Sequence, residues 1–169
     1  SDGSFLTHNS IRKFGRMKLV DKKQLQQIID KHGPEPLEKD FTSAVFQQIL
    51  SAKKRANIKT VLMDQRVIAG IGNIYAQEAL YYAKISPFRP AGSLSSAEVK
   101  SLHAHLQKIL RQAIEHHGST VDNYSNLEGS GGFQNYLAVY QRDKCPEGHD
   151  IDKAVIGGRG TSYCSSCQR

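Results

Sequence analysis

Four residues near the end of the chain have the types and spacing of a metal site. Cys164 and Cys167 form a Cys-x-x-Cys pair, and Cys145 with His149 lies about fifteen residues upstream. Thiolate sulfur and imidazole nitrogen are preferred donors for tetrahedral Zn²⁺. The three cysteines are an odd number and do not suggest a disulfide framework. We therefore expect one structural zinc ion held by these four residues, with a metal-free hairpin as the alternative.

The same segment predicts a hairpin that a zinc ion would help to fold. Residues 154–156 and 161–163 are short β-rich runs, and a glycine-rich turn separates them. Arg159 lies at the expected tip, where its guanidinium can donate two or more hydrogen bonds to a phosphate. Residues 136–140 alternate in polarity and predict one further strand.

Residues 58–82 contain two glycines, Gly70 and Gly72, between two short helical segments. Glycine permits tight turns and close backbone approach. The second helix should begin at about Asn73, which could cap the helix or reach a ligand. A helix that opens after such a turn presents unpaired N–H groups and the positive end of its dipole, which together favour a phosphate.

Three interpretations of this glycine-rich stretch compete. A dinucleotide-binding turn requires a third glycine where Tyr75 stands and an acid near residue 90, where Pro90 and Ala91 stand instead. A buried helix contact without a ligand would also explain the glycines. The remaining interpretation is a pair of helices joined by two turns that grips a DNA backbone.

Residues 4–7 and 15–20 read as two strands around a basic loop that contains Arg12 and Phe14. A hairpin with a charged tip is the simpler interpretation. The alternative is a wedge, in which the arginine contacts a duplex and the aromatic ring inserts between bases. Further along, a capping box at Ser95 and Glu98 opens the longest helix, which Gly118 ends, and residues 119–133 form a glycine-rich loop.

Composition favours a polyanion as partner. Lys and Arg total 23 against 16 acidic residues, which gives a net charge of +7. No apolar run approaches the roughly 18–20 residues that span a membrane, and the first residues lack a signal-peptide core. We therefore expect a monomer in a reducing compartment, in the cytoplasm or on the nucleoid, or in the nucleus of a eukaryote.

Four motifs resemble the Fpg/Nei family of DNA glycosylases. Residues 63–78 read MDQRVIAGIGNIYAQE and resemble the helix–two-turns–helix signature of that family. Residues 11–16, IRKFGR, resemble its intercalating loop, although Ser10 stands where the family usually has Asp. Residues 32–37 resemble its inter-domain segment, and residues 157–168 resemble its zinc finger, which more often has four cysteines.

The resemblance implies roles for particular residues. Asn73 and Arg159 match residues that grip the phosphates flanking a lesion, and Gly70 and Gly72 belong to the DNA-binding turns. Arg12 matches the residue that faces the orphaned base, and Phe14 the one that fills the stack after the damaged nucleotide is flipped out. Lys59 matches a residue on the DNA-facing side. The loop at 119–133 matches the one that folds over the flipped base.

These observations predict a mainly α fold: a helix–two-turns–helix domain followed by a small zinc-bound β-hairpin and preceded by residual strands of a β-sandwich. We expect residues 1–30 to be a remnant of the N-terminal catalytic domain with its wedge loop, and residues 31–40 to be a linker. Residues 41–134 should form the helical DNA-binding domain and residues 135–169 the zinc finger.

The resemblance further implies the DNA-binding part of a bifunctional DNA glycosylase and AP lyase for oxidised bases of the 8-oxoguanine or formamidopyrimidine type. Its partner would be double-stranded DNA with a damaged or abasic site. Family members begin with a nucleophilic Pro followed by Glu, whereas this sequence reads SDG at its start. We therefore assign no catalytic residue and expect binding without catalysis. The alternative is a zinc-dependent nucleic-acid-binding module with no enzymatic parent.

Overall fold

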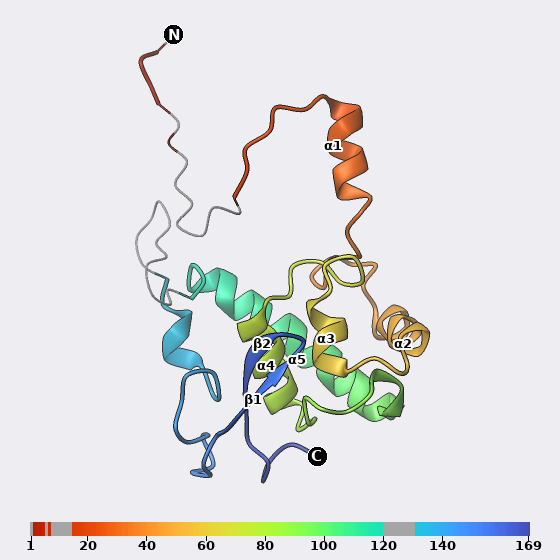
Figure 1. Ribbon diagram of the computed structural model, residues 1–169, viewed down its shortest axis with the longest axis vertical. Helices are drawn as coiled ribbons and strands as arrows, with labels where there is room; N and C mark the ends of the chain where they lie inside the picture. Colours follow the sequence, from red (N-terminus) through yellow and green to blue (C-terminus); the bar gives the residue numbers. More distant parts are fainter. Residues whose placement is uncertain (1, 6, 8–14, 120–130) are drawn as a thin grey trace. The chain divides into compact units, whose positions relative to one another are not determined.

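The computed structural model describes residues 2–5, 7, 15–119 and 131–169. Its contacts divide the chain into two compact units, residues 1–31 and 32–169. The described residues are mainly helical, with one two-stranded antiparallel sheet near the C-terminus (Figure 1). The predicted fold class is confirmed in both respects.

Within the described residues of the first unit there is one helix, α1 (Lys22–Ile29), which begins where the Asp21 side chain accepts a hydrogen bond from the Gln24 backbone N–H at 2.7 Å. The predicted sandwich strands are wrong for the described residues, because residues 15–20 and the described part of 4–7 form no strand. A strand is stabilised by the ladder it shares with a neighbour. No ladder within the described ranges includes these residues.

The second unit holds the remaining elements. In chain order they are α2 (Ser43–Ala52), α3 (Ile58–Met63), α4 (Asn73–Tyr82), the 3₁₀ turn η1 (Ala91–Ser93), α5 (Ser96–Glu115), the 3₁₀ turn η2 (Phe133–Tyr136), β1 (Asp152–Ile156) and β2 (Arg159–Tyr163). The predicted capping box opens α5: the Ser95 hydroxyl accepts from the Glu98 N–H, and the Glu98 carboxylate accepts from the Ser95 N–H.

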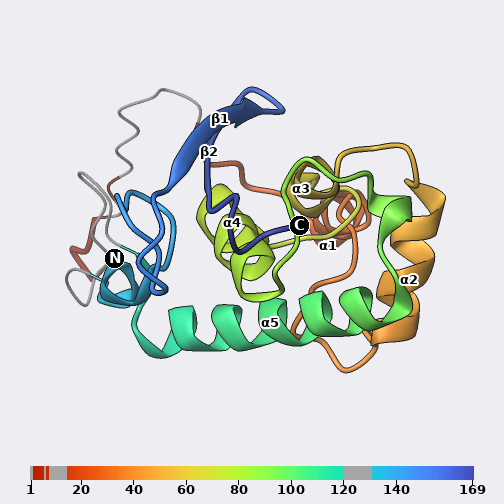
Figure 2. The ribbon, with the colours of Figure 1, turned by 90° about the horizontal axis from the view of Figure 1, so that it is seen from below.

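Helix α4 lies between two layers of the second unit. It packs on one side against α5 and on the other against β2, and Figure 2 shows α5 and the hairpin on opposite sides of it. Its residues from Ala76 to Tyr81 are all buried. Apolar side chains of α2, α3, α4 and α5 form one core, to which Phe133 also contributes. The position of α4 therefore decides how the hairpin sits on the helices.

The hairpin has the predicted form, with a two-residue turn at Gly157 and Gly158. Both glycines have positive φ, 57° and 71°, as this type of tight turn requires. Ile156 pairs with Arg159, so Arg159 is the first residue of β2 rather than part of the turn itself. It lies directly beside the tip and is exposed.

Residues 137–140 form no strand, so the prediction of a strand over residues 136–140 is wrong. The buried carboxylate of Glu78 accepts three consecutive backbone N–H groups, from Ala138 at 2.6 Å, Val139 at 3.1 Å and Tyr140 at 2.9 Å. A strand would have turned successive N–H groups to opposite sides. Their shared acceptor on α4 fixes the chain in a tight curve instead.

Within the described ranges, no helix combines the length and the apolar character required to cross a membrane.

Glu78→Gln tests the role of this carboxylate. The amide would present an NH₂ group to three backbone donors and would lose the charge, so we expect a loss of about 2 kcal/mol in the free energy of unfolding. Urea denaturation monitored by circular dichroism measures this loss as a lower midpoint. Glu115→Gln, at an exposed end of α5, is the control and should leave the midpoint unchanged. Equal midpoints for the two variants would contradict this role.

Candidate nucleic-acid interface and metal centre

The two turns between α3 and α4 are braced by Gln65. Its side-chain oxygen accepts from the Gly70 N–H at 2.8 Å, and its side-chain NH₂ donates to the Ile71 carbonyl at 2.8 Å. The Gln65 backbone carbonyl also accepts from the Gly33 N–H at 2.9 Å. One exposed side chain thus fixes both turns. Gln65 lies within the sequence motif, but nothing in the motif indicates this role.

The two glycines of these turns have different backbone requirements. Gly70 has a φ of 81°, in the region where other residues are strained. Gly72 has a φ of −97° and a ψ of 177°, which any residue adopts, and it precedes α4 as its N-cap. A Cβ at Gly72 would meet no atom within 4 Å. The backbone therefore requires glycine at position 70, while position 72 leaves open space in front of the helix.

Asn73 begins α4 but does not cap it, which excludes one of the two roles that the sequence left open for its side chain. Its side-chain oxygen accepts from Lys59 Nζ at 2.8 Å, and its side-chain nitrogen donates to the Gly160 carbonyl at 3.1 Å. Side-chain caps are absent from the first turn of α4. Unpaired N–H groups and the positive end of the helix dipole therefore remain available at this point.

Lys59 is a fully buried cation at this site. Its exposed fraction is 0%, and its ammonium donates to Asn73. Burial, together with the nearby charge of Arg159, lowers the pKa of Lys59 to about 8. Both causes disfavour the charged form of Lys59. An anion bound between Lys59 and Arg159 would offset the repulsion between these two cations and raise the pKa of Lys59 again.

Gln77 joins the hairpin to α4. Its side-chain oxygen accepts from the Ser162 N–H at 2.5 Å, and its side-chain nitrogen lies 3.3 Å from the Gly160 carbonyl. Its exposed fraction is 2%. Gly157 lies against the Thr60 side chain of α3. These contacts place Arg159 and Asn73 on the same side of the second unit, although they lie far apart in the sequence.

The arrangement suits an oxyanion. An amide, an exposed guanidinium, a buried ammonium and a helix N-terminus converge where α3, α4 and β2 meet. All four can donate hydrogen bonds or present positive charge to a phosphate. The structure therefore brings together Lys59, Asn73 and Arg159, which the sequence had singled out separately.

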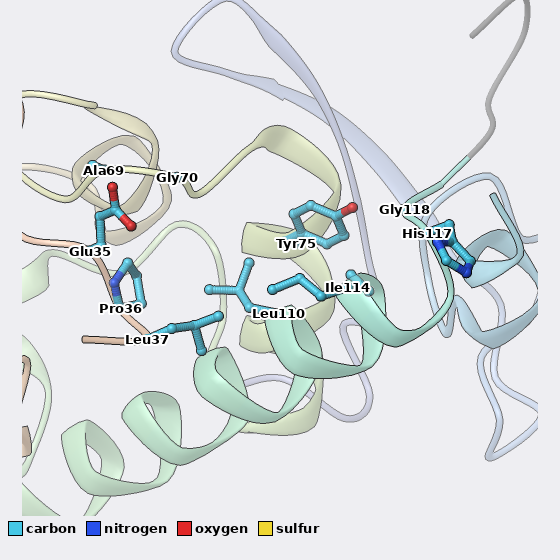
Figure 3. A pocket seen from close by; sticks show the side chains of 11 residues that line it. Glu35, Pro36, Leu37, Ala69, Gly70, Tyr75, Leu110, Ile114, His117 and Gly118 are labelled. Atoms are coloured by element: carbon cyan, nitrogen blue, oxygen red, sulfur yellow. The ribbon is translucent and has the colours of Figure 1, made fainter. Parts of the chain in front are cut away.

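An apolar pocket of about 460 Å³ lies between the turn at Ala69 and Gly70 and the end of α5 (Figure 3). Segment 35–37, the turn at Ala69 and Gly70, the Tyr75 ring and the last turns of α5 line it. Among these described lining residues there is no Lys or Arg. A phosphate is therefore better accommodated beside Asn73 than in this pocket.

Arg12 and Phe14, predicted to form the wedge, lie outside the described residues. So does most of the predicted loop at 119–133, of which only residues 119 and 131–133 are described. Phe133 is buried, and its ring contacts Tyr75 edge-on at 5.7 Å between centroids.

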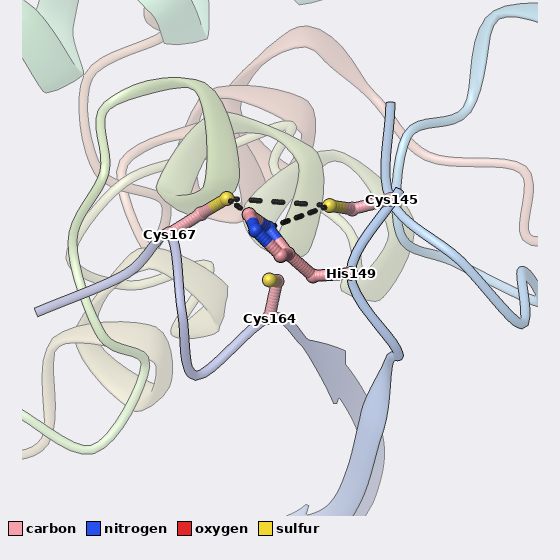
Figure 4. Close-up of side chains that lie close together, drawn as sticks. All are labelled: Cys145, His149, Cys164 and Cys167. Atoms are coloured by element: carbon pink, nitrogen blue, oxygen red, sulfur yellow. Dashed lines mark hydrogen bonds between the residues drawn. The ribbon is translucent and has the colours of Figure 1, made fainter. Parts of the chain in front are cut away.

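The predicted metal ligands meet at one point. The ligand atoms of Cys145, His149, Cys164 and Cys167 all lie within 4.8 Å of one another. Figure 4 shows the four side chains pointing toward a common centre, with His149 and Cys145 on one segment and the other two cysteines on the segment that follows β2. The Cys164 N–H donates to the Gln168 side chain at 2.8 Å, which in turn donates to the Ile85 carbonyl at 2.9 Å.

The spacing of these atoms fits a tetrahedral zinc ion. Zn–S bonds of about 2.3 Å and Zn–N bonds of about 2.0 Å imply ligand separations of about 3.8 Å for S–S and about 3.5 Å for S–N. The Sγ atoms of Cys145 and Cys167 are 4.0 Å apart, and His149 Nδ1 lies 3.7 Å and 3.3 Å from them. Three thiols and an imidazole form a closed structural set, which leaves no position for a reacting ligand.

Comparisons with known proteins agree with this geometry. A family model described as the formamidopyrimidine-DNA glycosylase H2TH domain matches residues 32–125, which is more than half of the chain. The formamidopyrimidine-DNA glycosylase of Roseiflexus sp. is 45% identical over 99% of this chain, and that of Geobacillus kaustophilus is 42% identical over all of it. The chain spans 63% and 64% of the length of these two relatives.

Solved structures give the same result. The MutM (Fpg) protein of Thermus thermophilus superposes with a TM-score of 0.84 at 40% identity, over 94% of this chain and 62% of that one. Lactococcus lactis Fpg in complex with abasic-site DNA superposes with a TM-score of 0.86 at 38% identity, over 94% and 60%. Together with the matched family model, the paired turns before α4 and the four clustered ligands show that this chain belongs to the formamidopyrimidine-DNA glycosylase family.

Proposed function

We propose that this chain is the damaged-DNA-binding part of a base-excision-repair enzyme, a bifunctional DNA glycosylase and AP lyase for oxidised bases of the 8-oxoguanine or formamidopyrimidine type. The observation that carries the proposal is the convergence of Lys59, Asn73 and Arg159 at the N-terminus of α4. The partner is double-stranded DNA with a damaged or abasic site, which in bacteria places the protein on the nucleoid.

Three residues would hold the DNA backbone. Arg159 is exposed beside the hairpin tip and can give a phosphate two parallel hydrogen bonds. Asn73 has its amide orientation fixed by Lys59 and Gly160, so its NH₂ group faces the hairpin and the phosphate path. Gly70 and Gly72 would let the DNA backbone approach the turns closely, because no Cβ occupies the space in front of α4.

The zinc ion would have a structural role. The two-stranded hairpin is too small to bury a core of its own, and Val155 on β1 is 76% exposed. Metal binding contributes folding free energy directly in such small units. Zinc held by Cys145, His149, Cys164 and Cys167 would keep the base of the hairpin closed. The hairpin would then hold Arg159 on the same side of the unit as Asn73.

We propose that residues 1–30 continue from the catalytic domain and carry the wedge residues Arg12 and Phe14. Residues 31–40 would be the linker, residues 41–134 the helical DNA-binding domain and residues 135–169 the zinc finger. Phosphate contacts fix the position of a protein on a duplex and carry no sequence information. We therefore expect selectivity for a lesion and none for the surrounding base sequence.

A fluorescence titration with two duplexes tests the proposal. One duplex is undamaged, and the other carries a stable abasic analogue. A flipped-out site lowers the cost of unstacking, so we expect at least about ten-fold tighter binding to the abasic duplex, lost when a chelator removes zinc. Equal affinity for the two duplexes would instead favour a general nucleic-acid-binding module.

Arg159→Ala separates a phosphate contact from a general effect of charge. We expect weaker binding to both duplexes and a log–log salt dependence that is less steep by about one unit, because one counterion fewer is released. Arg111→Ala removes the same charge from an exposed position on α5 and is the control. If the two variants have the same salt dependence, Arg159 makes no phosphate contact.

The pKa of Lys59 predicts how DNA affinity depends on pH. In the free chain this pKa is lowered to about 8, and a bound phosphate would raise it, so binding should take up a proton above pH 8. Affinity should therefore stay level below pH 8 and fall by at most about ten-fold per pH unit above it. Lys59→Met should bind more weakly at pH 7 and lose this part of the pH dependence. Parallel pH profiles for the two proteins would contradict a protonated Lys59 in the complex.

A further inference from the structure

Tyr81 is a buried phenol on α4 that faces the metal centre. Its exposed fraction is 1%, and it packs in one cluster with Cys145, Cys164 and residues 138 and 139. Lys84 Nζ lies 4.9 Å from the centre of its ring, and the Tyr82 ring contacts it edge-on at 5.3 Å. These contacts hold the ring in place, so its hydroxyl can reach a hydrogen-bond partner only within this cluster.

The Tyr81 hydroxyl is one of two buried side-chain polar atoms without a hydrogen-bond partner among the described residues. A buried hydroxyl left unpaired costs free energy, and such groups in folded proteins nearly always find a partner. The cluster around the ring includes the sulfur of Cys145, and a protonated thiol sulfur is only a weak acceptor. The structure thus contains a buried donor beside a sulfur that becomes a strong acceptor when it ligates a metal as a thiolate.

Zinc binding would make the Cys145 sulfur a strong hydrogen-bond acceptor. A zinc-bound cysteine is a thiolate, and hydrogen bonds to a charged acceptor are stronger than neutral ones. A phenol is protonated at neutral pH and can donate this hydrogen bond. Metal ligands in proteins are commonly fixed by such donors from the surrounding shell.

We infer that the Tyr81 hydroxyl donates a hydrogen bond to the zinc-bound thiolate of Cys145, positions that ligand, and so couples helix α4 to metal occupancy. The inference rests on the zinc centre described above. It links α4 to a metal ligand independently of Gln77 and Glu78, which hold the hairpin and segment 138–140 by accepting from backbone N–H groups. Tyr81 is a positioning residue and does not ligate the metal.

Tyr81→Phe tests the inference, because it removes the hydroxyl and keeps the ring. In a competition titration with a chromogenic zinc chelator, we expect the 169-residue chain with this substitution to bind zinc about ten-fold more weakly. Tyr82→Phe removes a hydroxyl from the adjacent residue, whose side chain is 40% exposed and lies outside the cluster, and it should bind zinc like the wild type.

The stability of the metal-free protein separates this role from simple packing. After zinc removal, Tyr81→Phe should unfold at the same urea concentration as the wild type or a higher one, because it lacks the unpaired hydroxyl. With zinc bound, it should unfold at a lower concentration. Equal zinc affinity for Tyr81→Phe and the wild type would overturn the inference, as would equal destabilisation with and without zinc. Failure of the wild type to bind zinc would instead overturn the metal centre itself.

Discussion

The backbone carbonyl of Gly160 is the contact on which the candidate interface depends. It lies on the edge of β2 that faces α4, and it is within reach of the side-chain nitrogens of both Asn73 and Gln77. An exposed strand edge presents unpaired backbone groups, and here side chains of one helix satisfy them. These hydrogen bonds fix the position of the hairpin on α4. The position of Arg159, which precedes Gly160 in β2, is fixed with it.

Four residues of helix α4 each make a separate contact with a neighbouring part of the second unit. Asn73 at its start orients toward Lys59 and the hairpin, and Gln77 one turn later binds the β2 edge. Glu78 binds the segment that leads to the first metal ligand, and Tyr81 packs against that ligand. This explains why the helix is buried on nearly all sides and why so many of its buried residues are polar. A polar residue on a buried helix is stable only when its partners are supplied by the elements packed around it.

Local sequence was sufficient wherever the structure is set by short-range chemistry. The glycine turn of the hairpin, the capping box of α5 and the Cys-x-x-Cys pair each depend on a few adjacent residues, and all three were predicted. The two strands predicted at 15–20 and 136–140 were wrong for a common reason. A local sequence pattern allows a strand but does not supply its partner, and at 138–140 the buried Glu78 carboxylate accepts the backbone N–H groups instead.

The sequence by itself determined the family motif, the donor set for zinc and the identity of the three cationic or amide residues at the interface. Only the tertiary structure decided that Lys59 is buried against Asn73, that Asn73 reaches Gly160 rather than capping its helix, and that Gln65, Gln77 and Glu78 hold the turns and the tail. The physical reason is the range of these contacts. Gln77 and Ser162 are brought together by helix and hairpin packing, and no local pattern encodes the partner of a polar side chain so far along the chain.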